Sequence, residues 1–194
     1  ELDREWAEKM HEQQIRPYSQ YLLVKEGNPY WRIAVLTEEA FDHILRPMMQ
    51  KTSLFLEQKG YEVEVGKFSI LKKDSFQGLE ERFWTGTEKI HHIELDFLTS
   101  ASFKKNGEYK IFPELPLVFN NLVRKWNVYS DSMILGEERL GDKLAESMCI
   151  TDYRLHTHPF SVEGRRIRAF RGNIRLGLFK DDITRRMASM LAAF

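Results

Sequence analysis

HIELDF, at residues 92–97, alternates polar and apolar side chains one by one. This period of two is typical of a strand that is buried on one face, here the face of Ile93, Leu95 and Phe97. A helix is predicted from Pro113 onward, with an apolar stripe at Leu115, Phe119, Leu122 and Trp126. Beyond it, the pattern predicts a helix over 134–146, a strand pair over 149–158 and 165–179, and a helix over 181–192. The order of this part is β-α-(α)-β-β-α.

The preceding part of the chain has a related order of elements. Leu2, Trp6 and Met10 recur at four-residue spacing and predict a helix over 2–15, which Pro17 ends. Thr37 is a suitable N-cap for a helix over 38–58, in which Pro47 predicts a kink or break. Strands are predicted over 18–24, 30–36 and 63–71. The order of this part is α-β-β-α-β.

Each part matches a ferredoxin-like unit, βαββαβ, that lacks one strand. The predicted fold class is therefore α+β, with tandem ferredoxin-like halves over 1–86 and 87–194, each an antiparallel sheet with helices on one face. The first half lacks its opening strand and the second its closing strand, so the missing strands fall at the two ends of the sequence. A sheet without them exposes an unpaired edge.

Composition and charge narrow the class of protein. The 194 residues carry 29 Lys and Arg against 29 Asp and Glu, but from Cys149 onward nine basic residues stand against four acidic ones. This asymmetry indicates either a surface that faces a polyanion or a solvated strand surface. The single cysteine excludes an internal disulfide and a cysteine-based zinc site, which fits a cytoplasmic location. No apolar run approaches the length of a membrane span, so no membrane partner is predicted.

Three stretches in order resemble one family. They are residues 15–19 (IRPYS), residues 92–104 (HIELDFLTSASFK) continuing to 119–122 (FNNL), and residues 169–176 (AFRGNIRL). Together they resemble the CRISPR repeat-processing endoribonucleases of the repeat-associated mysterious protein superfamily. The resemblance implies two ferredoxin-like halves and a metal-independent endoribonuclease that cleaves precursor CRISPR RNA within its repeats. The family's glycine-rich loop, expected after the last helix, is absent from this sequence, and the tyrosine that some members use would lie before Glu1.

The resemblance also implies an active site. His11 matches the position of the family's catalytic histidine, and Arg16 the place where some members have lysine. Such enzymes direct a ribose 2′-OH at the adjacent phosphate, which gives a 2′,3′-cyclic phosphate and a 5′-OH. Histidine suits proton transfer near neutral pH, whereas arginine clamps phosphate but is a poor proton donor. The general acid is therefore either His11 itself or the family's tyrosine. Without the resemblance, His11 is interpreted as a surface histidine of an amphipathic helix.

Basic residues near the middle and the end of the chain are the predicted RNA contacts. Lys104 and Lys105 lie in a loop beside Phe103, which could stack on a base. The late strands contribute Arg165, Arg166, Arg168, Arg171 and Arg175. A polar hairpin tip and a solvated strand face explain the same residues equally well.

The remaining histidines predict no metal site, and no cofactor is predicted. His91 and His92 are adjacent, so one is expected to face the core and the other the solvent. His156 and His158 share a strand face and could bind a metal, but no carboxylate or cysteine spacing supports one, and a role near RNA is equally open. His43 is expected to pack among apolar neighbours.

The predicted partners are precursor CRISPR RNA and the mature guide RNA, which the enzyme is expected to retain. One alternative is a non-catalytic RNA-binding subunit of a CRISPR effector complex. Another is an unrelated ferredoxin-like protein that binds small molecules or another protein.

Overall fold

The computed structural model describes residues 4–57, 59–87, 89–162 and 164–194. The chain divides into two compact units, one up to Lys73 and one over Asp74–Phe194. Helix α4 (Phe76–Thr85) belongs to the second unit because it packs against the last helix of the chain, α7 (Asp182–Ala193). This division differs from the predicted boundary between residues 86 and 87, which placed α4 in the first half.

The first unit combines short helices with two antiparallel hairpins. Its helical elements are α1 (Arg4–Glu12), α2 (Glu38–Ala40), the π-helical turn η1 (Phe41–Leu45) and α3 (Arg46–Met49). Its hairpins are β1 (Tyr18–Lys25) with β2 (Asn28–Val35), and β3 (Ser53–Leu56) with β4 (Tyr61–Glu64). A small core joins Trp6 and Met10 of α1 to Ala40 of α2. Leu2, predicted in the same stripe, lies outside the described residues.

The predicted helix over 38–58 begins where expected, but it is wrong beyond Met49. Thr37 caps it, since its Oγ1 accepts a hydrogen bond from the N–H of Ala40 at 3.1 Å. A proline has no N–H and clashes with the carbonyl four residues earlier, so Pro47 interrupts regular α-helix. The π-helical turn directly before it widens the helix at that point. The hairpin β3–β4 then occupies residues that were predicted as helix and as strand.

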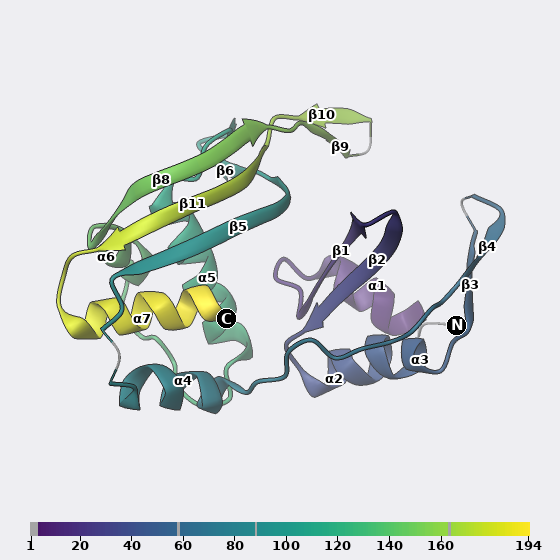
Figure 1. Ribbon diagram of the computed structural model, residues 1–194, viewed down its shortest axis with the longest axis horizontal. Coiled ribbons are helices and arrows are strands. Elements are labelled where there is room, and N and C mark those ends of the chain that lie inside the picture. The colour runs from purple at the N-terminus through teal and green to yellow at the C-terminus, as the bar shows by residue number, and fades with distance from the viewer. Residues whose placement is uncertain (1–3, 58, 88, 163) are drawn as a thin grey trace. The chain divides into compact units, whose positions relative to one another are not determined.

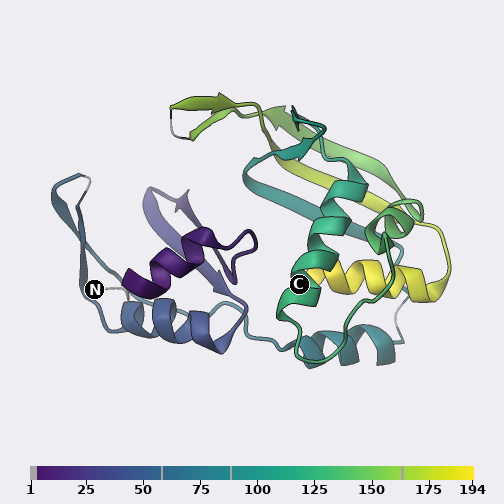
Figure 2. The same ribbon diagram turned by 180° about the vertical axis from the view of Figure 1, so that it is seen from behind.

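The second unit is built on a three-stranded antiparallel sheet in the order β5-β11-β8. Its strands are β5 (His92–Ala101), β8 (Met148–Thr157) and β11 (Phe170–Leu178). Helices α5 (Leu115–Tyr129) and α7 cover one face of this sheet (Figures 1 and 2). Between them lies the main core, in which Phe119, Trp126 and Leu191 are fully buried. The α+β class and the βαββα order of this unit are confirmed.

Two small hairpins leave the same end of the sheet. One consists of β6 (Phe103–Lys105) and β7 (Glu108–Lys110), the other of β9 (Phe160–Val162) and β10 (Arg165–Ile167). The register pairs Phe170 of β11 with Ala101 of β5 and with Thr157 of β8. Because the strands are antiparallel, the end of β5, the end of β8 and the start of β11 meet there, as Figure 1 shows. The strand predicted over 165–179 is thus split into β10 and β11.

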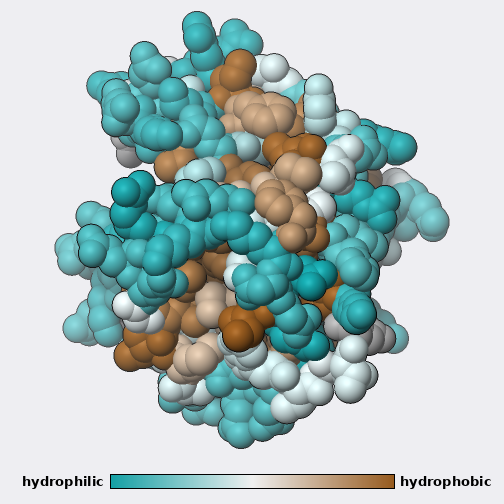
Figure 3. Space-filling view, turned by 90° about the vertical axis from the view of Figure 1, so that its left-hand side faces the viewer, coloured by the Kyte–Doolittle hydropathy of each residue, from teal (hydrophilic) through white to brown (hydrophobic). Residues whose placement is uncertain are grey.

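The opposite end of the sheet joins α6 (Leu140–Ala145) and α7. Met148, at the start of β8, pairs with Leu178, at the end of β11. Helix α6 is shorter than the predicted 134–146, since Arg139 before it adopts a left-handed conformation, φ 58°. Among the described helices, none is both long and apolar enough to span a membrane. On the face shown in Figure 3, hydrophobic side chains gather in patches between hydrophilic ones.

Candidate active site and nucleic-acid interface

His11 and Arg16 belong to the first unit and lie close together in the sequence. His11 is in the last turn of α1, and Arg16 is in the loop between α1 and β1. Both side chains are exposed, whereas the neighbouring Met10 and Pro17 are buried. The two buried residues anchor the end of the helix and the start of the strand. A histidine and an arginine are thereby held on either side of a short, exposed loop.

The buried side of α1 explains why His11 faces solvent. Trp6 donates its Nε1–H to Glu39 Oε1 at 3.2 Å, and its ring stacks on His43 with centroids 5.1 Å apart. Lys9 lies 3.5 Å from the same Glu39 carboxylate. These contacts fix the face of α1 that carries Trp6 and Met10 against the rest of the unit. His43 is a packing residue, as its apolar neighbours predicted.

Six of the seven predicted RNA contacts meet at one end of the second unit's sheet. We call this region the basic end; it consists of Lys104, Lys105, Arg165, Arg166, Arg168 and Arg171. All six side chains are exposed. Lysines from β6 and arginines from β10, β11 and the segment between them are far apart in sequence. The antiparallel register brings these residues to the same end of the sheet, where their positive charges add.

Arg175, the seventh predicted contact, lies elsewhere. It is four residues after Arg171 in β11, which places it about 13 Å along the strand from that member of the basic end. Its Nε is 3.7 Å from Glu94 Oε1, and it pairs in register with Asp152. These carboxylates offset its charge, so Arg175 contributes less to a polyanion-binding surface than the other six.

The two lysines of β6 have different surroundings. Lys105 Nζ donates to Glu114 Oε2 at 2.6 Å, and this hydrogen bond holds the pKa of Glu114 below its usual value. Lys104 has its Nζ 5.8 Å from the centre of the Tyr109 ring. Lys104 therefore keeps more of its charge for a ligand. Tyr109 is exposed and was missed from the sequence, because its place beside Lys104 follows from the pairing of β6 with β7.

Phe103 does not offer a free stacking surface. It is half-buried, and its ring lies 6.2 Å from that of Phe170, which is itself buried. The rings of Phe97 and Phe170 meet edge to face, with centroids 4.9 Å apart. The three rings form a support beneath the basic end. The predicted role of Phe103 in base stacking is therefore disfavoured by its packing.

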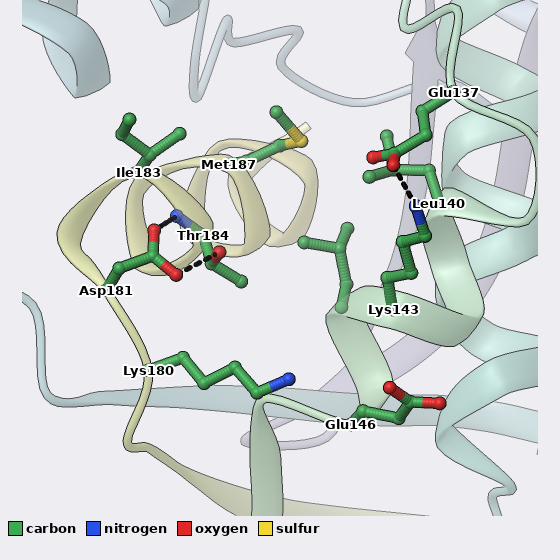
Figure 4. A pocket seen from close by; sticks show the side chains of 10 residues that line it. Glu137, Leu140, Lys143, Glu146, Lys180, Asp181, Ile183, Thr184 and Met187 are labelled. Carbon is green, nitrogen blue, oxygen red and sulfur yellow. Dashed lines mark hydrogen bonds and ion pairs between the residues drawn. The ribbon is translucent and has the colours of Figure 1, made fainter.

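A depression of about 390 Å³ lies at the opposite end of the sheet, between α6 and the start of α7 (Figure 4). Lys143 pairs there with Glu137, and Asp181 caps α7 by accepting a hydrogen bond from the Thr184 N–H at 2.9 Å. That bond lowers the pKa of Asp181. These charged groups already have partners within the fold, and the depression is separated from the basic end by the length of the sheet.

The other histidines are now placed. His91 and His92 are both exposed, so the prediction that one faces the core is wrong; β5 begins only at His92. His156 and His158 do share a face, with ring centroids 6.2 Å apart. In the described part of the chain, no group of three or more His, Cys, Asp or Glu side chains has the arrangement of a metal site. Cys149 is exposed and unpaired with another cysteine.

The fold and its surface define an α+β protein with a cationic edge suited to a polyanion. Comparison with known proteins identifies the family to which this α+β protein belongs. The family model "CRISPR-associated endoribonuclease Cas6" matches residues 95–194. A Cas6 of Streptococcus thermophilus is 30% identical over 174 residues, which cover 90% of this chain and 70% of the relative. The chain therefore belongs to the Cas6 family of CRISPR-associated endoribonucleases.

More distant relatives agree with this assignment. A Cas6 of Mycobacterium tuberculosis is 29% identical over 178 residues, and there the chain spans only 55% of the relative's length. Among solved structures, a Cas6 product complex has a TM-score of 0.77 at 19% identity, with 98% of this chain and 79% of that chain covered. Cas6 of Thermus thermophilus has a TM-score of 0.65 at 19% identity, covering 99% and 76%. The fold of the whole described chain is thus a Cas6 fold.

Proposed function

We propose that this protein is a metal-independent endoribonuclease that cleaves precursor CRISPR RNA within its repeats. Family membership supports the endoribonuclease class. The observation that carries the choice of an RNA ligand is the basic end, where six exposed lysines and arginines from distant segments converge. Proteins bind nucleic-acid backbones mainly by neutralising phosphates with such side chains. Solved relatives of the same fold include a product complex and a substrate mimic complex.

The proposed chemistry uses the two exposed residues that flank the end of α1. His11 takes the proton of the ribose 2′-OH, and the oxygen attacks the adjacent phosphate. Arg16 stabilises the negative charge that develops on the phosphorane. The bond to the 5′-oxygen breaks, leaving a 2′,3′-cyclic phosphate on one product and a 5′-OH on the other. The leaving oxygen takes its proton from His11 or from another acid, because Arg16 stays protonated.

One comparison of variants tests this assignment. Full-length protein is incubated with repeat RNA in EDTA, and the product ends are mapped. His11→Ala is expected to lower the single-turnover cleavage rate about 10²–10⁴-fold, the usual contribution of a general acid or base. His91→Ala, an exposed histidine on the other unit, is the matched control and should cleave at the normal rate. RNA affinity should be the same in both variants.

Two outcomes would contradict the proposal. Normal cleavage by His11→Ala would remove that residue from the site. A need for divalent metal, or products with a 3′-OH, would rule out the cyclic-phosphate mechanism.

A non-catalytic RNA-binding subunit of a CRISPR effector complex is the alternative that the basic end also favours. It predicts salt-dependent RNA binding without cleavage by the wild-type protein. Under the main proposal, the cytoplasmic enzyme cuts the repeat and then retains the mature guide RNA through the basic end. Gel analysis of the protein after reaction, with RNA labelled on each side of the cut, distinguishes the two.

A further inference from the structure

Ser100 and His158 are brought together at the basic end by the sheet. Ser100 Oγ lies 2.6 Å from His158 Nδ1, although the two residues are 58 positions apart in the sequence. His156 is two residues before His158, and its ring meets that of His158 nearly at right angles. Both histidines are exposed and Ser100 is half-buried. The cluster of Ser100, His156 and His158 belongs neither to the proposed catalytic residues nor to the predicted RNA contacts.

An irregularity of the sheet places this cluster. Phe170 pairs with Ala101, but Gly172, only two residues on, pairs with Phe97. Strand β5 therefore bulges between these two pairings, and a bulge re-aims the side chains that it carries. Ser100 is one of them. It reaches His158 across the start of β11, which runs between β5 and β8.

The backbone beneath the cluster is fixed on both sides. The N–H of His158 donates to the carbonyl of Ala169 at 2.9 Å, and Ser102 Oγ donates to the carbonyl of Arg168 at 2.9 Å. Ala169 itself is fully buried. The cluster therefore rests on an ordered support and is not the tip of a loop.

Positive charge surrounds the cluster. Arg171 pairs in register with His156, and Arg168 lies directly before the buried Ala169. Arg154 lies two residues before His156, on the same face of β8. The carboxylates of this surface lie farther than His156 from the basic end. Asp96 pairs in register with Asn173 of β11, and Asp152 pairs in register with Arg175. Hydrogen-bonding imidazoles beside Arg168 and Arg171 favour an anion.

We propose that Ser100, His156 and His158 form a subsite for an RNA phosphate, which helps to hold the RNA that the enzyme processes. This inference rests on the proposed function. Ser100 is a positioning residue, because its bond to Nδ1 leaves Nε2 of His158 as the ring nitrogen available to a phosphate oxygen. His158 makes the contact, and His156 extends it toward Arg171. A metal ion is disfavoured, since the described chain offers no third ligand there and the nearby arginines repel a cation.

The test measures RNA affinity separately from cleavage. Repeat RNA with a 2′-deoxy sugar at the cleavage site is titrated in EDTA, with Kd taken from fluorescence anisotropy at several salt concentrations. His158→Ala is expected to raise Kd about 10- to 150-fold, as for the loss of one hydrogen bond to a charged group. Ser100→Ala should raise it about 2- to 5-fold, and Ser100→Thr, which keeps the hydroxyl, should restore binding. His92→Ala, an exposed histidine at the other end of β5, is the control.

With the enzyme below its Kd for unmodified RNA, His158→Ala should cleave more slowly in proportion to its raised Kd, whereas His92→Ala should cleave at the wild-type rate. A Kd for His158→Ala equal to that of His92→Ala would overturn the subsite while leaving the endoribonuclease proposal intact. A parallel titration without EDTA separates a metal role: an effect of His158→Ala that is present without EDTA and absent in EDTA would assign the cluster to a metal and also overturn the subsite. If the wild-type protein neither binds nor cleaves repeat RNA, the proposed function fails, and this inference fails with it.

Discussion

Gly172 offers the sharpest test of how the basic end is built. Its φ of +129° is a conformation that side-chain-bearing residues rarely adopt, and a Cβ there would lie 1.9 Å from the carbonyl oxygen of Arg154. That atom belongs to the neighbouring backbone of β8, so no side chain can turn aside to make room. Gly172→Ala therefore combines backbone strain of about 1–3 kcal/mol with displacement of the strand. We expect a total loss of roughly 3 kcal/mol in unfolding free energy.

Two other glycines separate these contributions. Gly107 also has a positive φ, +82°, but a Cβ there would meet nothing within 4 Å; Gly107→Ala should cost about 1 kcal/mol from strain alone. Gly136 has open space and an ordinary φ, so Gly136→Ala should change stability by less than about 0.5 kcal/mol. Urea unfolding followed by tryptophan fluorescence measures all three. A chain of this size should lose about 6–12 °C in Tm for Gly172→Ala. A loss no greater than that of Gly107→Ala would refute the close approach of β11 to β8.

Three further substitutions test the second unit. Trp126→Phe removes an indole N–H that donates to the half-buried backbone carbonyl of Met133 at 2.9 Å, and should cost about 2 kcal/mol in urea unfolding. Arg186→Met removes two hydrogen bonds to carbonyls at the end of α4, one of them that of Gly86; about 1–2 kcal/mol is expected, with α4 exchanging amide hydrogens faster. Asp181→Ala uncaps α7 and should lower Tm, whereas Asp181→Asn keeps an accepting oxygen and should lower it less. The hydrogen bonds from Thr184 lower the folded-state pKa of Asp181. The wild type therefore gains stability above the unfolded pKa of this carboxyl group and loses it as the pH falls through the folded pKa. A Tm scan below about pH 5 should show this contribution of Asp181 being lost in the wild type and not in Asp181→Asn.

The elements that were predicted well are those whose local pattern and tertiary role agree. The alternation over 92–97 became β5, and the stripe that ends at Trp126 became the buried side of α5. The misjudged elements depend on long-range pairing. Arginine and apolar residues continue without a turn signal from Arg165 to Arg171, yet β10 pairs with β9, and β11 pairs with β5 and β8. The sequence pattern is the same on both sides of that break.

The candidate site was foreseeable in its residue types and not in its arrangement. The contact of Ser100 with His158 accompanies a bulge in β5 between the pairings of Phe170 and Gly172, and no local pattern marks it. Arg171 and Arg175 are equivalent in sequence, since both alternate with apolar neighbours in one strand. They differ only in their cross-strand partners, which are His156 for the first, and Glu94 and Asp152 for the second.

This difference in partners explains how a chain with equal numbers of basic and acidic residues can present a cationic surface. Pairing in the antiparallel sheet places Glu94 of β5 and Asp152 of β8 opposite Arg175, in the middle part of β11. The same topology sends both basic hairpins from the end of the sheet at Phe170, where the register supplies no carboxylate opposite Arg171. Charge is thus sorted along one strand by pairing, without any change in total charge. A phosphate backbone that approaches this sheet experiences attraction at the basic end and repulsion beyond it, so the polarity of the sheet itself directs where RNA is held.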